Sequence, residues 1–393
     1  MVRAALVGGP MYDPLYDAIP QFTRDTGIPV EIVVRLPHPE LNAWVASSFA
    51  SGNPGVDVLS THTKYAPSQA QWLEPLDDVI TSEHEADLLP RGAALARIRG
   101  VLLQIPRYID VRLLHYRRDL VGDIAPDTWS ELADVASAMA TPDRAGFLFP
   151  GRDSGLFGGF YELLIGAGGT LFHDDLSPAF ESDAGLWAVR YLTDLHHVRR
   201  VTSPQMTRWH YDEISAEFRA GRAAMVCDWP GSYHLYRNPA TCAAAESVSL
   251  SRLPAGPAGS RSAYAGCHTF AIPRGGRNPS EAAALIRYLT SSEAQLGEAR
   301  RGAIPCRASA LARVREEMSA NPIEATRWEL LAESQETMII PPRFASYPSC
   351  EDAIWHAVQQ AMIGAISAEQ ALTMAAAAVR EIVGDSDRQQ VQP

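Results

Sequence analysis

Residues 228–231 place a carboxylate and an indole next to each other, ahead of a Pro-Gly turn, in the order Asp228-Trp229-Pro230-Gly231. The apolar residues 223–227 before them have the length of a buried strand, which the turn ends. An indole offers a flat apolar face to the C–H face of a sugar ring, and a carboxylate accepts hydrogen bonds from hydroxyl groups. The pair predicts contacts to a hydroxyl-rich ligand, and the alternative for Trp229 is burial in the core.

The rest of the chain alternates short apolar segments with segments of helical spacing. Val2–Val7, Pro29–Leu36 and Val56–Ser60 are predicted strands, and Leu15–Thr26 and Leu41–Ser51 are predicted helices. Strand–helix–strand units with short loops favour an α/β fold in which helices cover both faces of a parallel sheet. Ligands of such sheets bind outside the carboxyl ends of the strands.

Polar and aromatic residues follow several predicted strands. The groups after the first and third strands are Met11, Tyr12 and Asp13, and then Thr61, His62 and Thr63. For the first group, an Asp-Pro turn with Tyr12 packed locally explains the residues equally well. For the second group, ligand contact is favoured over helix capping, because a simple turn more often uses Gly or Asn.

Two later segments have the same character. Leu102–Ile105 is a predicted strand that leads into a loop ending at Asp110, for which pairing with a nearby arginine is the alternative to ligand contact. Gly155, Leu156 and Phe157 precede a helix predicted for residues 158–166. Free backbone N–H groups at that helix start would meet ligand oxygens, and a glycine cap with buried Phe157 is an equally good explanation.

Four arginines lie in or beside these segments and raise the possibility of a charged ligand: Arg107, Arg112, Arg152 and Arg343. Arginine recognises phosphate, sulfonate or carboxylate groups through paired hydrogen bonds. An anionic sugar or glycerol conjugate is therefore an alternative ligand, although exposed surface arginines would give the same pattern. Arg343 follows two prolines and precedes Phe344 and Tyr347, and its alternative role is to pair with an acid and fix the loop.

Composition limits the classes of function. The 393 residues exceed the usual size of one core, which predicts two domains, and a net charge of −12 argues against a nucleic-acid partner. The five cysteines have no C-x-x-C spacing; a Cys227–Cys242 disulfide is possible, but scattered buried thiols are favoured. No metal motif, nucleophile motif or phosphate loop occurs, so we expect no metal, no cofactor and no catalysis. A glycoside-acting enzyme is the weaker alternative.

Four segments carry a family resemblance: Gln71–Asp77, Ile109–Leu120, Cys227–Gly231 and Gly266–Pro273. They resemble segments of the extracellular solute-binding proteins of bacterial ABC importers, in the carbohydrate-binding group. The resemblance implies an α/β, two-domain periplasmic-binding-protein-like (type II) fold with hinge strands and a ligand cleft between the domains. The implied domains are residues 1–110 plus 271–310 and residues 111–270 plus 311–393.

The same resemblance implies a function and a site. The chain would be a monomer that captures a sugar or glycoside by hinge closure and delivers it to membrane permease subunits. The location would be periplasmic or extracellular, after removal of a signal peptide that this sequence does not contain. The resemblance places ligand contacts at Asp110 and at the strand Gly266, Cys267 and His268, and brings an aromatic such as Tyr347 to the ligand beside Arg343.

Overall fold

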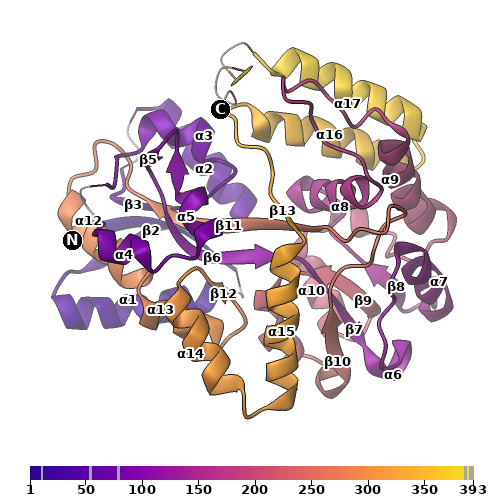
Figure 1. The fold of residues 1–393 in the computed structure, drawn as a ribbon, viewed down its shortest axis with the longest axis horizontal. Coiled ribbons are helices and arrows are strands. Elements are labelled where there is room, and N and C mark those ends of the chain that lie inside the picture. The colour runs from indigo at the N-terminus through magenta and orange to yellow at the C-terminus, as the bar shows by residue number, and fades with distance from the viewer. Residues whose placement is uncertain (10–11, 53–54, 78–79, 385–386, 389–393) are drawn as a thin grey trace. The chain divides into compact units, whose positions relative to one another are not determined.

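The computed structural model of the chain describes residues 1–9, 12–52, 55–77, 80–384 and 387–388 (Figure 1). Contacts divide the chain into two units. Unit 1 comprises residues 1–110 and 266–328, and unit 2 comprises residues 111–265 and 329–393. The chain therefore passes between the units three times, after Asp110, Ala265 and Trp328.

The family resemblance implies crossings after residues 110, 270 and 310, and the contacts divide the units after residues 110, 265 and 328. Strand β11 (Ala263–Ala271) already pairs with β3 (Val58–His62) of unit 1 at His268, before the predicted boundary at residue 271. At the third crossing, helix α14 (Ala308–Met318) belongs to unit 1, where it packs against α13 and Arg300 Nη2 lies 2.8 Å from Glu317 Oε1. Long-range contacts of this kind decide the boundary, and no local composition marks it.

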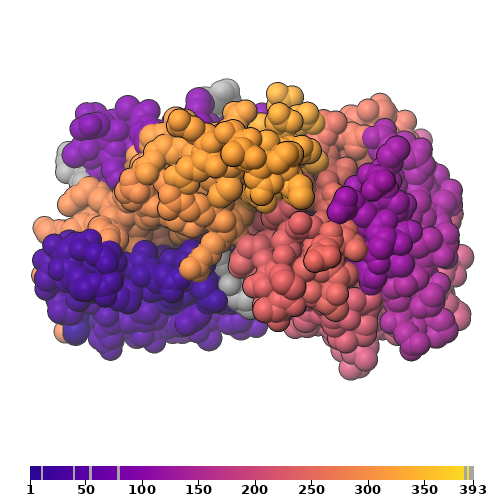
Figure 2. Space-filling model, turned by 90° about the horizontal axis from the view of Figure 1, so that it is seen from below, coloured from indigo at the N-terminus to yellow at the C-terminus, as the bar shows by residue number. Residues whose placement is uncertain are grey.

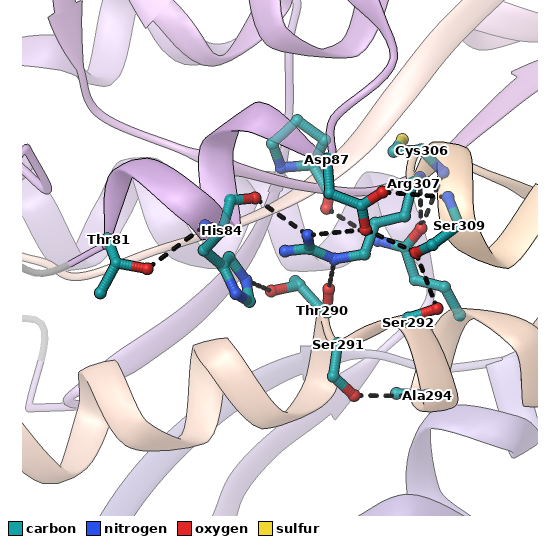
Figure 3. A network of polar contacts seen from close by, with 12 residues as sticks. Thr81, His84, Asp87, Thr290, Ser291, Ser292, Ala294, Cys306, Arg307 and Ser309 are labelled. Atoms are coloured by element: carbon teal, nitrogen blue, oxygen red, sulfur yellow. Dashed lines mark hydrogen bonds and ion pairs between the residues drawn. The ribbon is translucent and has the colours of Figure 1, made fainter.

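Arg307 lies at the centre of a polar network that holds α14 to unit 1 (Figure 3). Its Nη1 donates to His84 O at 2.9 Å and to Asp87 Oδ2 at 3.3 Å, and its Nε donates to Thr290 O. Ser309 Oγ donates to the same Asp87 oxygen at 2.6 Å. The network connects three segments of unit 1 through one arginine that is 2% exposed, so residues after 307 remain part of this unit.

Unit 1 is built around a mixed sheet in which the strand order is β12-β6-β11-β3-β1-β2. Apart from β11, the strands of unit 1 are β1 (Val2–Val7), β2 (Val30–Leu36), β3, β4 (Arg97–Ile98), β5 (Val101–Leu102), β6 (Ile105–Val111) and β12 (Ile304–Pro305). Of these, β4 and β5 pair with each other in a separate two-stranded sheet. Its helices are α1 (Asp13–Thr26), α2 (His38–Ala50), α3 (Ala66–Gln69), α4 (Ser82–Ala86), α5 (Pro90–Ala96), α12 (Pro279–Leu289), α13 (Ser292–Ala299), α14 and the first part of α15 (Pro322–Glu336). β1 pairs in parallel with β2 and β3, as predicted, whereas β11 runs antiparallel to β3.

Alternation along β1 sorts its side chains onto two cores. Val2, Ala4 and Leu6 pack in one buried cluster with residues of α1 and α12. Ala5 and Val7 pack in a second cluster with residues of α2. Successive strand residues face opposite sides of a sheet, so the sheet of unit 1 is covered on both faces, as the sequence predicts.

Segments distant in sequence lie side by side in unit 1. Figure 2 shows the indigo N-terminal segment next to the orange segment around residue 300. Arg301 Nη2 lies 2.9 Å from Asp17 Oδ2 of α1, an ion pair between these two segments. The pair is exposed, so it adds little to stability and mainly records how the helices pack.

Unit 2 has a sheet in the order β10-β7-β9-β8. Apart from β11, the strands of unit 2 are β7 (Leu113–Arg117), β8 (Ala145–Leu148), β9 (Ala223–Asp228), β10 (Val248–Ser251) and β13 (Met338–Ile339). Its helices are α6 (Arg118–Val121), α7 (Trp129–Met139), α8 (Asp153–Gly166), α9 (Asp183–Thr193), α10 (Tyr211–Arg219), α11 (Tyr233–Tyr236), α16 (Tyr347–Met362), α17 (Ala368–Ile382) and the end of α15. Figure 1 shows α16 and α17 lying side by side.

Several element boundaries differ from the sequence predictions: β3 ends at His62 rather than at Ser60, for example, and two further differences are larger. Residues 106–110, predicted as a loop, form the interior of β6. Helix α8 begins at Asp153 rather than at residue 158. Three glycines in its first two turns mask the helical pattern, and at Gly158 a Cβ would come within 2.9 Å of the Tyr264 ring. Close packing, rather than a turn, thus explains that glycine.

Candidate functional site

Unit 1 gathers three histidines from three elements. His38 opens α2, His62 ends β3 and His268 lies on β11, where the antiparallel register places it opposite His62. The ring centroids are 5.4–5.6 Å apart, and the ring planes are nearly perpendicular. Within the described residues, no group of three or more His, Cys, Asp or Glu side chains is arranged to hold a metal ion.

Asp110 and Tyr108 adjoin the histidines from β6. Asp110 Oδ2 lies 3.4 Å from His268 Nε2, and the Tyr108 ring centroid lies 4.9 Å from that of His268. Both residues are 3% exposed. Among the described residues, Asp110 Oδ1 and Tyr108 Oη have no hydrogen-bond partner. Because buried polar atoms are nearly always paired, these two oxygens mark a place where a ligand hydroxyl would complete the hydrogen bonding.

Burial also fixes the chemical form of Tyr108. It raises the pKa of the phenol well above its ordinary value of 10.0. The side chain therefore keeps its proton near neutral pH and can either donate or accept a hydrogen bond. Asp110 thus offers a hydrogen-bond acceptor, and Tyr108 offers a donor or an acceptor.

Unit 2 presents an aromatic group around Trp229, which follows β9. The Trp229 ring lies 5.1 Å from Tyr211 and 6.2 Å from Tyr264, measured between centroids. Trp229 is half-buried, whereas the side chains at the end of β9 are fully buried. A half-buried indole braced by two tyrosines can present one apolar face to a ligand.

A buried ion pair lies under these aromatics. Arg112 Nε donates to Glu162 Oε1 at 2.9 Å, Arg112 Nη2 donates to Glu162 Oε2, and both side chains are 1% exposed. Arg112 Nη1 also donates to Tyr211 Oη at 3.2 Å, and Tyr264 N donates to Glu162 Oε1 at 2.7 Å. The ion pair thereby positions the two tyrosines that contact Trp229.

Residues 17–326 match the family model described as bacterial extracellular solute-binding protein. The chain belongs to this family. The resemblance inferred from the sequence is confirmed. In the portion of the chain that is described, no helix is both long and apolar enough to span a bilayer.

Solved structures place this solute-binding protein in a fold group. Maltose-bound T. maritima MalE3 has a TM-score of 0.89 at 25% identity, covering 98% of this chain and 100% of that chain. An ABC transporter solute-binding protein from Thermotoga lettingae, bound with alpha-D-tagatose, has a TM-score of 0.88 at 24% identity, covering 98% and 99%. The predicted α/β fold of two-domain periplasmic binding proteins is therefore confirmed.

Curated relatives are more distant and match only in part. A probable ABC transporter-binding protein of Deinococcus radiodurans is 27% identical over 61% of this chain and 59% of its own length. A mannitol-binding protein of Pseudomonas aeruginosa is 23% identical over 56% of this chain and 52% of its own length. The match thus spans little more than half of each relative.

Several residues of unit 1 that were predicted to contact a ligand have interactions within the unit. Thr61 Oγ1 donates to Gln69 Oε1 at 2.7 Å, and Thr63 N donates to Cys267 O at 3.1 Å. A Cβ at Gly266 would come within 2.1 Å of His62 Nε2, so glycine is needed there to admit the His62 ring. These placements favour structural roles for Thr61, Thr63 and Gly266.

The segment after β1 is only partly informative. Met11 lies outside the described residues. Tyr12 is 8% exposed, and its ring meets that of His268 edge-on at 5.5 Å, which places it beside the histidine cluster. Asp13 is exposed at the start of α1, where Arg35 Nη2 lies 3.2 Å from its Oδ1. Of the three, Tyr12 is the one that the structure brings to the candidate site.

Asp228 is satisfied within unit 2, in contrast to Asp110. Its Oδ1 accepts from Trp229 N at 2.8 Å, and its Oδ2 accepts from Tyr236 Oη. Burial raises the pKa of Asp228 to about 6, against the opposing effect of hydrogen bonds from Tyr236, Trp229 and Ser232. The carboxylate shapes the turn that carries Trp229, and its predicted contact with a ligand hydroxyl stays a prediction.

Three other predicted contacts of unit 2 are core side chains. Leu156 and Phe157 are fully buried in α8, and Tyr347 meets Phe157 edge-on at 6.1 Å. Gly155 accepts a hydrogen bond from Arg112 Nη1 through its carbonyl at 3.0 Å. Leu156 N donates to Arg152 O at 3.1 Å, and the predicted contacts of this helix start with a ligand stay predictions.

The arginines that were considered as contacts for an anionic ligand interact with other residues of the chain. Arg107 Nε donates to Glu298 Oε1 at 2.8 Å, and the exposed fractions of the two side chains are 2% and 7%. Arg112 binds Glu162, as described above, and Arg152 Nη1 lies 3.3 Å from Asp153 Oδ2. Arg343 is half-buried and also takes part in an interaction within the chain. The hypothesis of an anion site therefore has no support from Arg107 or Arg112.

Sequence reasoning missed Tyr108, His38, Tyr211 and Tyr264. Tyr108 stands two residues before Asp110, and residues two apart on a strand share a face. Recognising residues 105–111 as a strand would have placed it beside Asp110. The other three come from elements that meet only in the folded chain, so no local pattern marks them.

Protonation of the histidine cluster gives a testable pH dependence. Burial, followed by the neighbouring His268, His38 and Lys64, holds the pKa of His62 well below its ordinary value of 6.5. The unfolded chain gains a proton at this residue as the pH falls below 6.5, and the folded chain does not. We therefore expect the melting temperature of unit 1 to decrease as the pH is lowered below 6.5. In His62→Gln the melting temperature should depend less on pH.

Thermal melts at several pH values between about 7.5 and about 5 test this prediction. His173→Gln, at an exposed histidine of unit 2, separates the effect of position from the loss of any histidine. Equal pH dependences for the wild type and His62→Gln would contradict the prediction.

Proposed function

We propose that this solute-binding protein is the substrate-binding component of an ABC importer, and that its ligand is a sugar or a polyol. The family match supports binding as the activity. The relatives named above are a mannitol-binding protein and structures with bound maltose and tagatose. Delivery to membrane permease subunits is part of the proposal and follows from the importer role.

The observation that carries the ligand class is the pair of unpaired oxygens on Asp110 and Tyr108. A buried carboxylate oxygen favours neutral hydroxyl donors, because each such donor offsets the cost of removing the charge from water. The same carboxylate would repel a phosphate or sulfonate group at short range. The chemistry of the site therefore favours a neutral hydroxyl-rich ligand over an anionic conjugate.

Ligand capture in periplasmic binding proteins uses hinge bending at a few residues that absorb backbone changes. In this chain we place the hinge at the three crossings, after Asp110, Ala265 and Trp328. Asp110 is both the last residue of unit 1 on the first pass and a proposed ligand contact. Binding at Asp110 would therefore act directly on a hinge residue.

A thermal-shift panel tests the ligand class. We expect maltose, mannitol, tagatose or ribitol to raise the melting temperature, and glucose 6-phosphate and glycerol 3-phosphate to leave it unchanged. Stabilisation by the phosphates alone would overturn the neutral-ligand proposal. Recovery of unaltered sugar after long incubation would be expected of a binding protein, and product formation would favour the enzyme alternative.

Trp229→Ala should weaken binding of the tightest sugar in that panel by about 1–3 kcal/mol, because a large aromatic contact is lost. Isothermal titration calorimetry measures the change. Trp72→Ala is the matched control, because Trp72 is a 36% exposed tryptophan of unit 1 stacked on Phe49. Unchanged affinity in a folded Trp229→Ala protein would remove Trp229 from the site.

A further inference from the structure

Two of the five cysteines meet inside unit 1. Cys267 lies on β11, and Cys306 directly follows β12, 39 residues later. Their Sγ atoms are 3.7 Å apart, and both residues are 0% exposed. The cysteine pair considered from sequence spacing, Cys227 and Cys242, is buried and unbonded in unit 2. The structure thus selects a different pair from the one closest in sequence.

The surroundings fix the position of both thiols. Cys306 N donates to Gln295 Oε1 at 2.8 Å. Cys267 is held in the β11–β3 ladder, because its carbonyl accepts from Thr63 N at 3.1 Å. Neither segment can move far, so the two sulfurs remain near each other as long as unit 1 is folded.

Their environment does not suit a reactive thiol. Reactive cysteines are partly exposed and lie beside positive groups or helix N-termini, which favour the thiolate. Here burial, followed by the hydrogen bond and charge of Cys267, raises the pKa of Cys306 well above its ordinary value of 9.0. A catalytic or metal-binding role is therefore disfavoured, and a structural role fits the burial.

We propose that Cys267 and Cys306 form a disulfide when the chain folds in an oxidising compartment. A disulfide has an S–S distance of about 2.0 Å, so the sulfurs need to approach by about 1.7 Å. The family is extracellular by description, and disulfides persist in such compartments. The remaining three cysteines, Cys227, Cys242 and Cys350, stay as thiols.

The reaction balances with a small-molecule disulfide such as glutathione disulfide as the oxidant. One cysteine thiolate attacks the oxidant, which forms a mixed disulfide and releases one glutathione. The second cysteine then attacks the mixed disulfide, which joins Cys267 to Cys306 and releases the second glutathione. Two protein thiols and one glutathione disulfide thus yield one protein disulfide and two glutathione thiols.

Burial predicts when this reaction occurs. An oxidant cannot reach either sulfur in the folded protein, so oxidation should be fast during refolding and slow after it. The bridge would close a loop of the chain and tie β11 to the β12–α14 connection. Because Cys267 lies between Gly266 and His268, the bridge would also restrict motion of the strand that carries His268.

Counting thiols tests the proposal. The chain is refolded with glutathione disulfide and then denatured and alkylated without reductant. We expect three alkylated cysteines, the loss of two hydrogen masses, and a Cys267–Cys306 cross-linked peptide; full reduction should give all five. The oxidised protein should melt several degrees higher, since a cross-link restricts the unfolded chain.

Two variants separate the possible pairings. Cys306→Ser should leave all four remaining thiols open to alkylation, whereas Cys242→Ser should still protect two of its four. Five alkylated cysteines in the refolded wild-type chain, or a cross-link between any other pair, would overturn the proposal. Peptide mapping of the wild-type chain gives the answer even if a variant fails to fold.

Discussion

Glu162→Gln is expected to lower the free energy of unfolding of unit 2 by about 3–5 kcal/mol, because it leaves the buried guanidinium of Arg112 without its counter-charge. Both side chains are 1% exposed. Solvent therefore cannot replace the lost partner. Urea denaturation followed by circular dichroism measures the change.

An exposed ion pair in the same unit provides the control. Arg190 Nη2 lies 2.5 Å from Glu369 Oε1, and the two side chains are 63% and 54% exposed. Glu369→Gln should leave stability unchanged, because water screens such pairs. If Glu162→Gln behaves like Glu369→Gln, the buried pair does not stabilise unit 2.

A double variant tests whether the cost comes from the unpaired charge. In the double variant Arg112→Met/Glu162→Gln no isolated charge remains. Its loss in the free energy of unfolding should therefore be smaller than the sum of the losses in the two single variants. Simple additivity would show that Arg112 and Glu162 act independently. The double variant should still bind sugar more weakly, since Tyr211 loses its contact with Arg112 Nη1.

Asp110→Ala is expected to weaken binding of the tightest sugar in the panel by about 10- to 100-fold, which corresponds to the loss of a hydrogen bond to a charged group. The reason is that Asp110 Oδ1 is a buried acceptor without a partner among the described residues. Asp110→Asn should lose less, since one carbonyl oxygen remains. Calorimetric titration of each variant measures the affinity.

Deoxy analogues of the same sugar locate the hydroxyl that Asp110 binds. Removing that hydroxyl should weaken binding to the wild type and have little further effect in Asp110→Ala. Asp17→Ala is the control, because Asp17 is an acid of unit 1 whose side chain is 64% exposed and pairs with Arg301. Wild-type affinity in a folded Asp110→Ala protein would exclude Asp110 as a ligand contact.

Local sequence patterns predicted the parts of the fold that depend on neighbouring residues. The predicted helix ending at Thr26 is α1, and the glycine expected to stop it, Gly27, has a φ of 70°. The strands β1, β2 and β3 were predicted in the same way. These features are readable because strand alternation, helix spacing and glycine caps act over a few residues.

The sequence also singled out Asp110 and Trp229, on which the proposed ligand contacts of the two units depend and which stay predictions. The same reasoning singled out Asp228, Leu156, Phe157 and Tyr347, whose contacts with a ligand also stay predictions. Their residue types suit a ligand equally well, but the fold buries them against partners in unit 2. Residue type alone does not show whether a polar or aromatic side chain already has a partner.

By itself, then, the sequence determined the α/β class, the family and the order of the elements. Only the tertiary structure decided the unit boundaries at residues 265 and 328, the histidine cluster and the proximity of Cys267 to Cys306. It also decided that Arg107 would bind Glu298, 191 residues away. Such partners depend on which strands become neighbours in a sheet, and hydrophobic periodicity reports only the face of an element and not its neighbour.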